Sequence, residues 1–229
     1  MSSFEGYEVV YHAALTLRAS QIQLLLTDLK ADFTMKGVDY GAEANGENKV
    51  VGGKAEGVSV FAAPCLKQGD FVLSQTTAIM NYLCEKHGVS AELNTPEARA
   101  KAEQLLQDAS DLQGEAYNIS KTSDEEKAKF ISERAVAFFK HLEKVCATTG
   151  KDSFLCGTTK PQACDYVLVT AMDTIKCGFG AKKLDETLSA NGFSALQGYY
   201  AMMTARDGYK AFIAKELGNQ LWEANCFKE

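Results

Sequence analysis

The sequence contains few of the residue types that would indicate a metal centre, a disulfide scaffold or a membrane span. Its 229 residues include only three histidines, three prolines and one tryptophan. The seven cysteines are odd in number and scattered, and none belongs to a C-x-x-C pair, which argues against a zinc cluster and a disulfide framework. No apolar run approaches the roughly 18 residues of a membrane span. We therefore expect no metal, and buried thiols in a reducing compartment.

The chain is acidic, and it shows no secretory signal. Its formal net charge is −6 and its basic residues are scattered, which argues against a nucleic-acid surface. The first residues contain neither a basic nor an apolar segment of the kind that secretory signals have. These absences favour a cytoplasmic protein without nucleic-acid or membrane partners.

The most informative stretch runs from Phe61 to His87. Pro64 favours an extended conformation at Ala63, because the proline ring crowds the preceding backbone. Two short apolar runs flank a polar turn at residues 67–70, which predicts a β-hairpin. An amphipathic helix is expected to follow the hairpin.

The start of that helix is suited to an acidic ligand. Its first main-chain N–H groups lack intrahelical partners and lie at the positive end of the helix dipole, so they favour a carboxylate. Gln75 and Thr76 could add side-chain hydrogen bonds, and the extended main chain at Ala63 could pair with a peptide. An ordinary hairpin and helix would account for these residues as well as a receptor for a small acidic peptide would.

The ordered set of residues in this stretch resembles the glutathione-site signature of the cytosolic glutathione transferases. That signature consists of a cis-proline, a hairpin and Gln-Ser or Gln-Thr at a helix start, followed by Ala-Ile and Tyr-Leu. The matching residues are Pro64, Gln75-Thr76, Ala78-Ile79 and Tyr82-Leu83. The resemblance is to the tyrosine-type members, of a sigma, mu or pi-like class or a related protist or fungal branch.

The first forty residues predict a strand, a helix and a second strand. Residues 7–12 alternate as a strand does, residues 22–29 carry apolar side chains on one helical face, and residues 32–38 suit a strand. Together with the hairpin and helix of residues 61–87, this is the thioredoxin-like βαβ-ββα layout that the resemblance implies.

Tyr11 is the expected catalytic residue. In tyrosine-type relatives a tyrosine at the end of the first strand donates a hydrogen bond to the glutathione sulfur, and Tyr11 and Arg18 match that spacing. A thiol with a pKa near 8.5 is only about 3% thiolate at pH 7, so a donor aimed at the sulfur favours the nucleophilic anion. Thr16 fits the rival serine-type pattern poorly, and the loop has no cysteine for a thioltransferase-like site.

The resemblance implies further glutathione contacts. Lys49 or Lys54 would bind the glycyl carboxylate, in a region where the family uses tryptophan or lysine, and Asp111 would reach the amino group across a dimer. Tyr117 would face the electrophile pocket. The implied glutathione-binding residues are Tyr11, Arg18, Lys49, Lys54, Ala63, Pro64, Gln75, Thr76 and Asp111.

The remainder of the chain predicts an all-α domain. Apolar residues keep helical spacing in several segments after residue 97, and a nearly continuous apolar run at residues 166–172 predicts a buried central helix. We expect domains at 1–88 and 97–229, with a linker at 89–96. Asp165 matches an N-capping aspartate of the family, although Gln162 replaces the usual hydroxyl residue, which weakens the side-chain cap.

The resemblance implies a homodimeric glutathione transferase that conjugates glutathione, its co-substrate, to hydrophobic electrophiles in detoxification. Two alternatives stay open on sequence alone. A glutathione-dependent isomerase or peroxidase would need the same thiolate, and a non-catalytic glutathione-binding or structural relative would keep the fold without the reaction.

Overall fold

The computed structural model describes residues 6–12, 17–38, 60, 62–150 and 152–218. These residues form two compact units. The first combines the chain up to Leu83 with helix α10 (Asp207–Gly218), and the second extends from Cys84 to Arg206. The sequence-based boundaries at residues 88 and 97 stay a prediction, although that prediction grouped α10 with the other helices of the C-terminal part.

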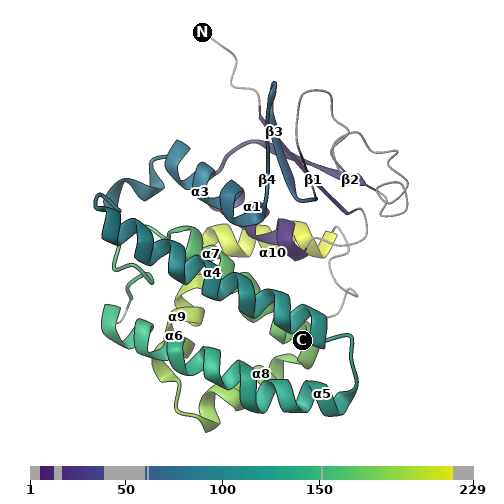
Figure 1. Ribbon diagram of the computed structural model, residues 1–229, viewed down its shortest axis with the longest axis vertical. Coiled ribbons are helices and arrows are strands. Elements are labelled where there is room, and N and C mark those ends of the chain that lie inside the picture. The colour runs from purple at the N-terminus through teal and green to yellow at the C-terminus, as the bar shows by residue number, and fades with distance from the viewer. Residues whose placement is uncertain (1–5, 13–16, 39–59, 61, 151, 219–229) are drawn as a thin grey trace. The chain divides into compact units, whose positions relative to one another are not determined.

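The first unit contains a mixed sheet of four strands in the order β2-β1-β3-β4 (Figure 1). Strand β1 (Tyr7–His12) pairs in parallel with β2 (Phe33–Val38) and antiparallel with β3 (Cys65–Gln68), which forms a hairpin with β4 (Phe71–Ser74). Helix α1 (Leu17–Asp28) connects the parallel pair, and α3 (Thr76–Lys86) follows the hairpin. The predicted thioredoxin-like βαβ-ββα layout is confirmed.

Helix α10 packs on α1 although almost 180 residues separate them in the sequence. Gly208 permits this approach, because a Cβ atom there would overlap the side chain of Asp28. The Nζ atom of Lys215 also lies 5.2 Å from the centre of the Phe33 ring, which adds a cation–π contact between α10 and β2. The end of the chain therefore completes the unit that its beginning forms.

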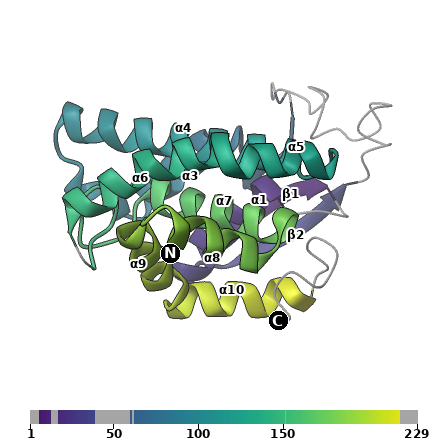
Figure 2. The same ribbon diagram turned by 90° about the horizontal axis from the view of Figure 1, so that it is seen from below.

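The second unit is entirely helical among its described residues, as the sequence predicted. Its longest helix, α4 (Pro96–Ile119), packs along the buried α7 (Ala163–Phe179), and α6 (Ala135–Thr149) packs against α9 (Ser194–Thr204) (Figure 2). Thr95 caps α4 by accepting a hydrogen bond from the N–H of Ala98. The other elements are η1 (Val89–Glu92), α5 (Asp124–Lys129), η2 (Phe130–Arg134) and α8 (Ala181–Ala190).

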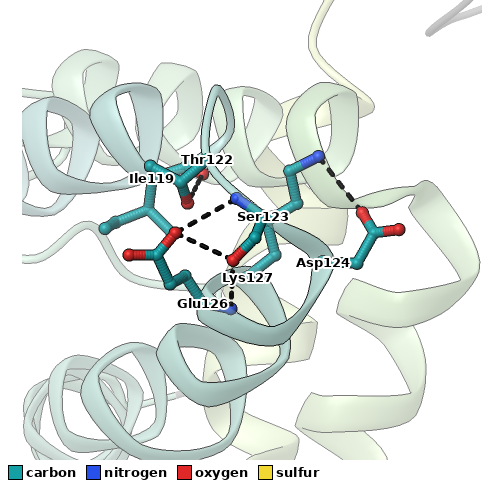
Figure 3. Close-up of polar contacts among 6 residues, drawn as sticks. All are labelled: Ile119, Thr122, Ser123, Asp124, Glu126 and Lys127. Atoms are coloured by element: carbon teal, nitrogen blue, oxygen red, sulfur yellow. Dashed lines mark hydrogen bonds and ion pairs between the residues drawn. The ribbon is translucent and has the colours of Figure 1, made fainter.

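Helix α5 has only six residues, and a capping box fixes its start (Figure 3). The Ser123 hydroxyl accepts a hydrogen bond from the N–H of Glu126, and the Glu126 carboxylate accepts one from the N–H of Ser123. The chain then passes through the π-helical turn η2 into α6. The helical spacing of apolar residues after residue 97 predicted helices in this part of the chain but missed this π-helical turn.

Asp165 organises the start of α7 from a fully buried position. Its carboxylate accepts hydrogen bonds from the N–H groups of Leu155 (2.9 Å) and Gln162 (2.6 Å) and from the Tyr199 hydroxyl (2.8 Å). Burial raises the pKa of this carboxyl to about 6, although the three hydrogen bonds act in the opposite direction. The prediction that Asp165 orders this helix start agrees with these contacts.

Gln162 does not replace the missing hydroxyl cap. Its side-chain amide nitrogen donates to the carbonyls of Val89 (3.1 Å) and Lys160 (3.0 Å), while its amide oxygen is buried without a hydrogen-bond partner. Gln162 therefore ties the loop before α7 to η1, and Asp165 supplies the cap.

No helix among the described residues is both long enough and apolar enough to span a bilayer.

Candidate active site

Three strand ends of the first unit bring three predicted site residues into one row. In the β1–β3 register Val10 lies opposite Cys65, so the next pair along is Tyr11 and Pro64. In the β3–β4 register Cys65 lies opposite Ser74, and continuing it by one residue brings Gln75 opposite Pro64. Neighbouring strands are about 4.8 Å apart, so the row from Tyr11 to Gln75 spans about 10 Å.

The middle of this row is shaped by the bond between Ala63 and Pro64, which is cis, as the sequence predicted. Pro64 is buried, and Ala63 is half-buried and packs against the small apolar cluster of Val10, Val60 and Cys65. The cluster holds Ala63 at the end of a central strand of the sheet, directly before β3.

The last position of the row has an unusual backbone conformation. Gln75 has φ +74°, a left-handed value that costs a residue with a Cβ atom about 1–2 kcal/mol. Its carbonyl accepts the first hydrogen bond of α3, from the N–H of Ile79 at 2.9 Å, so the side chain of Gln75 leaves the chain where the helix begins. Strain of this kind is often concentrated at binding sites.

Thr76, the first residue of α3, has a buried hydroxyl without a hydrogen-bond partner. The side chain is only 4% exposed, so the hydroxyl also has little access to water. A buried hydroxyl without a partner costs roughly 1–3 kcal/mol, and most buried polar groups in proteins are paired. Together with the N–H groups of the first helical turn, Thr76 supplies polar groups that suit a carboxylate ligand.

Tyr11 lies at the opposite end of the row. It is 5% exposed, and its hydroxyl oxygen accepts a hydrogen bond from the main-chain N–H of Arg18 at 3.4 Å. The sequence suggested Arg18 from its spacing, but a contact made by its main chain could not be found from residue type. The Arg18 side chain itself is exposed.

The remaining predicted residues lie elsewhere. Asp111 and Tyr117 belong to α4 in the second unit, where Asp111 is exposed and Lys121 lies 3.6 Å above the ring of Tyr117. Lys49 and Lys54 lie outside the described residues. The roles predicted for these four residues stay predictions. Among the described residues, no group of three or more histidine, cysteine or acidic side chains could hold a metal ion.

Comparison with known proteins finds a matching family model and similar solved structures. Residues 110–216 match the family model described as glutathione S-transferase, C-terminal domain, whereas no curated protein sequence matches the chain. A Pi-class glutathione S-transferase of Onchocerca volvulus has a similar structure, with a TM-score of 0.77 at 19% identity over 94% of this chain and 96% of its own.

Two further solved structures are similar. The glutathione S-transferase of Ascaris lumbricoides has a TM-score of 0.69 at 19% identity, covering 92% of this chain and 97% of its own. Rat hPGDS complexed with a quinoline has a TM-score of 0.70 at 13% identity, covering 91% and 96%. The chain therefore has the cytosolic glutathione S-transferase fold, and its residues 110–216 belong to the family of glutathione S-transferase C-terminal domains.

Proposed function

We propose that this protein is a glutathione transferase that binds glutathione along the row from Tyr11 through Pro64 to Gln75. The observation that carries the proposal is the buried, unpartnered hydroxyl of Thr76 beside the last position of that row. An extended tripeptide is about 10 Å long, which matches the two strand spacings that the row spans.

Each part of glutathione has a complementary group in this arrangement. The γ-glutamyl carboxylate would bind the first N–H groups of α3, the Thr76 hydroxyl and the Gln75 side chain. The main chain of the cysteinyl residue would pair with Ala63, which precedes the cis bond to Pro64. The sulfur would then lie at Tyr11.

Tyr11 would activate the thiol by hydrogen bonding. The Arg18 N–H group polarises the Tyr11 hydroxyl by donating to its oxygen, and this makes the hydroxyl a stronger donor. A donor aimed at the sulfur stabilises the thiolate and lowers the pKa of the bound thiol. The thiolate would attack an electrophilic carbon of a hydrophobic substrate, and the proton leaves to solvent. The enzyme contributes anion stabilisation and placement.

The family relationship supports the rest of the proposal. Arg18, together with Lys49 or Lys54, would attract the glycyl carboxylate, Asp111 would serve the glutathione of a partner subunit in a homodimer, and Tyr117 would contribute to the electrophile pocket. Conjugation of hydrophobic electrophiles in a detoxifying, cytoplasmic role is the activity we favour. A glutathione-dependent isomerase or peroxidase would use the same residues.

The decisive experiment has two parts. Calorimetric titration with glutathione tests the binding site, and we expect saturable binding that glycine or glutamate alone does not reproduce. A panel of halogenated nitroarenes, hydroperoxides and isomerisable enones then tests the reaction. Binding without turnover of any panel member would favour a non-catalytic relative, and no binding would overturn the proposal.

A further inference from the structure

Two cysteines of the second unit lie with their sulfur atoms in contact. The Sγ atoms of Cys156 and Cys164 are 3.6 Å apart, and both residues are reduced. Cys164, in the first turn of α7, is 1% exposed, whereas Cys156 is partly exposed on the loop that leads to this helix. Cys156 is therefore the more exposed residue of the pair, and its sulfur is in contact with that of the buried Cys164.

The Asp165 carboxylate fixes this pair. It accepts the N–H of Leu155 at 2.9 Å, and these two bonded residues directly flank Cys156 and Cys164 in the sequence. A short hydrogen-bonded link between residues 155 and 165 thus brings the adjacent cysteines together. The proximity of the sulfurs follows from the same contacts that order the start of α7.

Two contacts with η1 hold the loop between the cysteines. The Glu92 carboxylate accepts hydrogen bonds from the N–H group of Thr159 (2.9 Å) and from its hydroxyl (2.8 Å). Gln162 donates to the carbonyl of Val89 at 3.1 Å. The loop is thus fixed at its middle and near its end, so the two sulfurs meet in the folded protein without a rearrangement of the helices.

We propose that Cys156 and Cys164 are an oxidation site that forms an intramolecular disulfide when the protein meets a hydroperoxide. In the first step the Cys156 sulfur attacks one peroxide oxygen and the O–O bond breaks. Cys156 is oxidised to a sulfenic acid, and the leaving oxygen takes up the thiol proton and departs as an alcohol or water. In the second step the Cys164 sulfur attacks the sulfenic sulfur, and the hydroxyl leaves with the thiol proton as water.

The order of the two steps follows from the environments of the thiols. The hydrogen bond with Cys156 and, to a smaller extent, burial raise the pKa of the Cys164 thiol, so this thiol stays protonated. Burial also keeps Cys164 out of reach of a dissolved oxidant. Cys156 is the accessible partner and reacts first. Closing the bond needs the sulfurs to approach from 3.6 Å to about 2.05 Å. Gly157, whose Cβ position faces open space, leaves room on the loop side.

The other described cysteines of the second unit provide a comparison for Cys156. Cys84 and Cys146 are buried, and burial raises the pKa of each thiol to about 12, so neither is expected to react with a dissolved peroxide. Cys177, at the far end of α7, is partly exposed in the same way as Cys156 and therefore provides a matched control.

The test uses the full-length protein treated with hydrogen peroxide, followed by alkylation, trypsin and mass spectrometry. Trypsin does not cleave the Lys160–Pro161 bond, so Cys156 and Cys164 stay together in the peptide of residues 152–176. We expect this peptide to lose two hydrogen atoms and both alkylation sites, and to recover them after dithiothreitol. A peptide that keeps two alkylated cysteines, or gains oxygen on Cys156 while Cys164 stays alkylated, would overturn the proposal.

Variants assign the pairing. C177S should form the same disulfide as the wild type, whereas C164S should accumulate a sulfenic acid on Cys156 that a dimedone probe captures. In C156S, Cys164 should stay reduced. The result is read from the wild-type peptide and does not depend on the variants folding or on the glutathione site, so the proposed transferase activity can fail without affecting it.

Discussion

The main-chain N–H of Arg18 donates a hydrogen bond to the hydroxyl oxygen of Tyr11, 3.4 Å away. Arg18 is the second residue of α1 and Tyr11 lies near the end of β1, so this bond ties the start of the helix to the strand that precedes it. It also fixes the direction of the Tyr11 ring. The proposed thiolate donor is therefore positioned before any ligand binds.

Tyr11→Phe removes that donor and is expected to lower the conjugation rate about 10- to 100-fold, because a hydrogen bond to a charged group is worth about 1.5–3 kcal/mol. The same energy corresponds to a rise of about one to two units in the pKa of bound glutathione, which the ultraviolet absorbance of the thiolate measures against pH. Glutathione affinity should change little when the thiol is protonated.

Tyr7→Phe is the matched control for that variant. Tyr7 is buried on the same strand, four residues earlier and thus on the same face of the sheet, but at the opposite end of β1 from the row of site residues. Its removal should leave the pKa of bound glutathione unchanged. Equal pH–rate profiles for Tyr11→Phe and the wild type would show that Tyr11 is not the donor.

Thr76→Val should separate binding from stability. The variant removes a buried hydroxyl that has no partner, so we expect the free energy of unfolding without ligand to stay equal or increase. Glutathione affinity should fall about 10-fold or more, because the carboxylate loses a hydrogen bond. Calorimetry and urea denaturation measure the two quantities. Thr77→Val, one residue along and half-buried, is the control, and equal affinities in the two variants would contradict the proposed contact.

Gln75→Gly tests whether the strained backbone at Gln75 lowers stability while its side chain contributes to glutathione binding. Glycine adopts φ +74° without a Cβ clash, so the unfolding free energy should rise by up to about 1 kcal/mol while glutathione affinity falls with the loss of the side-chain amide. Gln75→Asn keeps an amide and tolerates the left-handed region, so it should lose less affinity than the glycine variant. A glycine variant that binds glutathione as the wild type does would remove Gln75 from the site.

Much of the first unit was predictable because its signals are local. The strand at residues 7–12 and the hairpin follow from residue types within short windows, and the structure has both. The cis bond before Pro64 was implied by the family resemblance of the same short stretch, and the structure has it too. The row of Tyr11, Pro64 and Gln75 was implied only by the family resemblance. It depends on strand register, which a single sequence does not specify.

The features that sequence reasoning missed depend on distant packing or on very short segments. Helix α8 has just two fully buried apolar anchors, Leu184 and Leu188, too few to establish a helical period. The packing of α10 on α1 depends on Gly208 next to Asp28, a contact between residues far apart in the sequence. The meeting of Cys156 and Cys164 likewise depends on hydrogen bonds of the Asp165 and Glu92 carboxylates, whose partners no spacing rule identifies.

Asp165 gives the last prediction, which concerns stability against pH. Burial raises its pKa in the folded protein to about 6, from an ordinary value of 3.8. A raised pKa means that the folded state holds the proton more tightly than the unfolded state does. The stabilisation is therefore complete below about pH 3.8 and is lost as the pH rises through 6. The difference between the two pKa values corresponds to about 3 kcal/mol of stability.

Comparing the wild type with Asp165→Asn isolates this contribution. The variant cannot titrate, so the wild-type free energy of unfolding should fall by about 3 kcal/mol relative to the variant between pH 4 and pH 7. Urea denaturation at several pH values measures this difference, with Asp185→Asn at an exposed position of α8 as the control. A wild type that instead gains stability relative to the variant would mean that the bonds from Leu155, Gln162 and Tyr199 outweigh burial, and that the carboxylate stays charged in the folded protein.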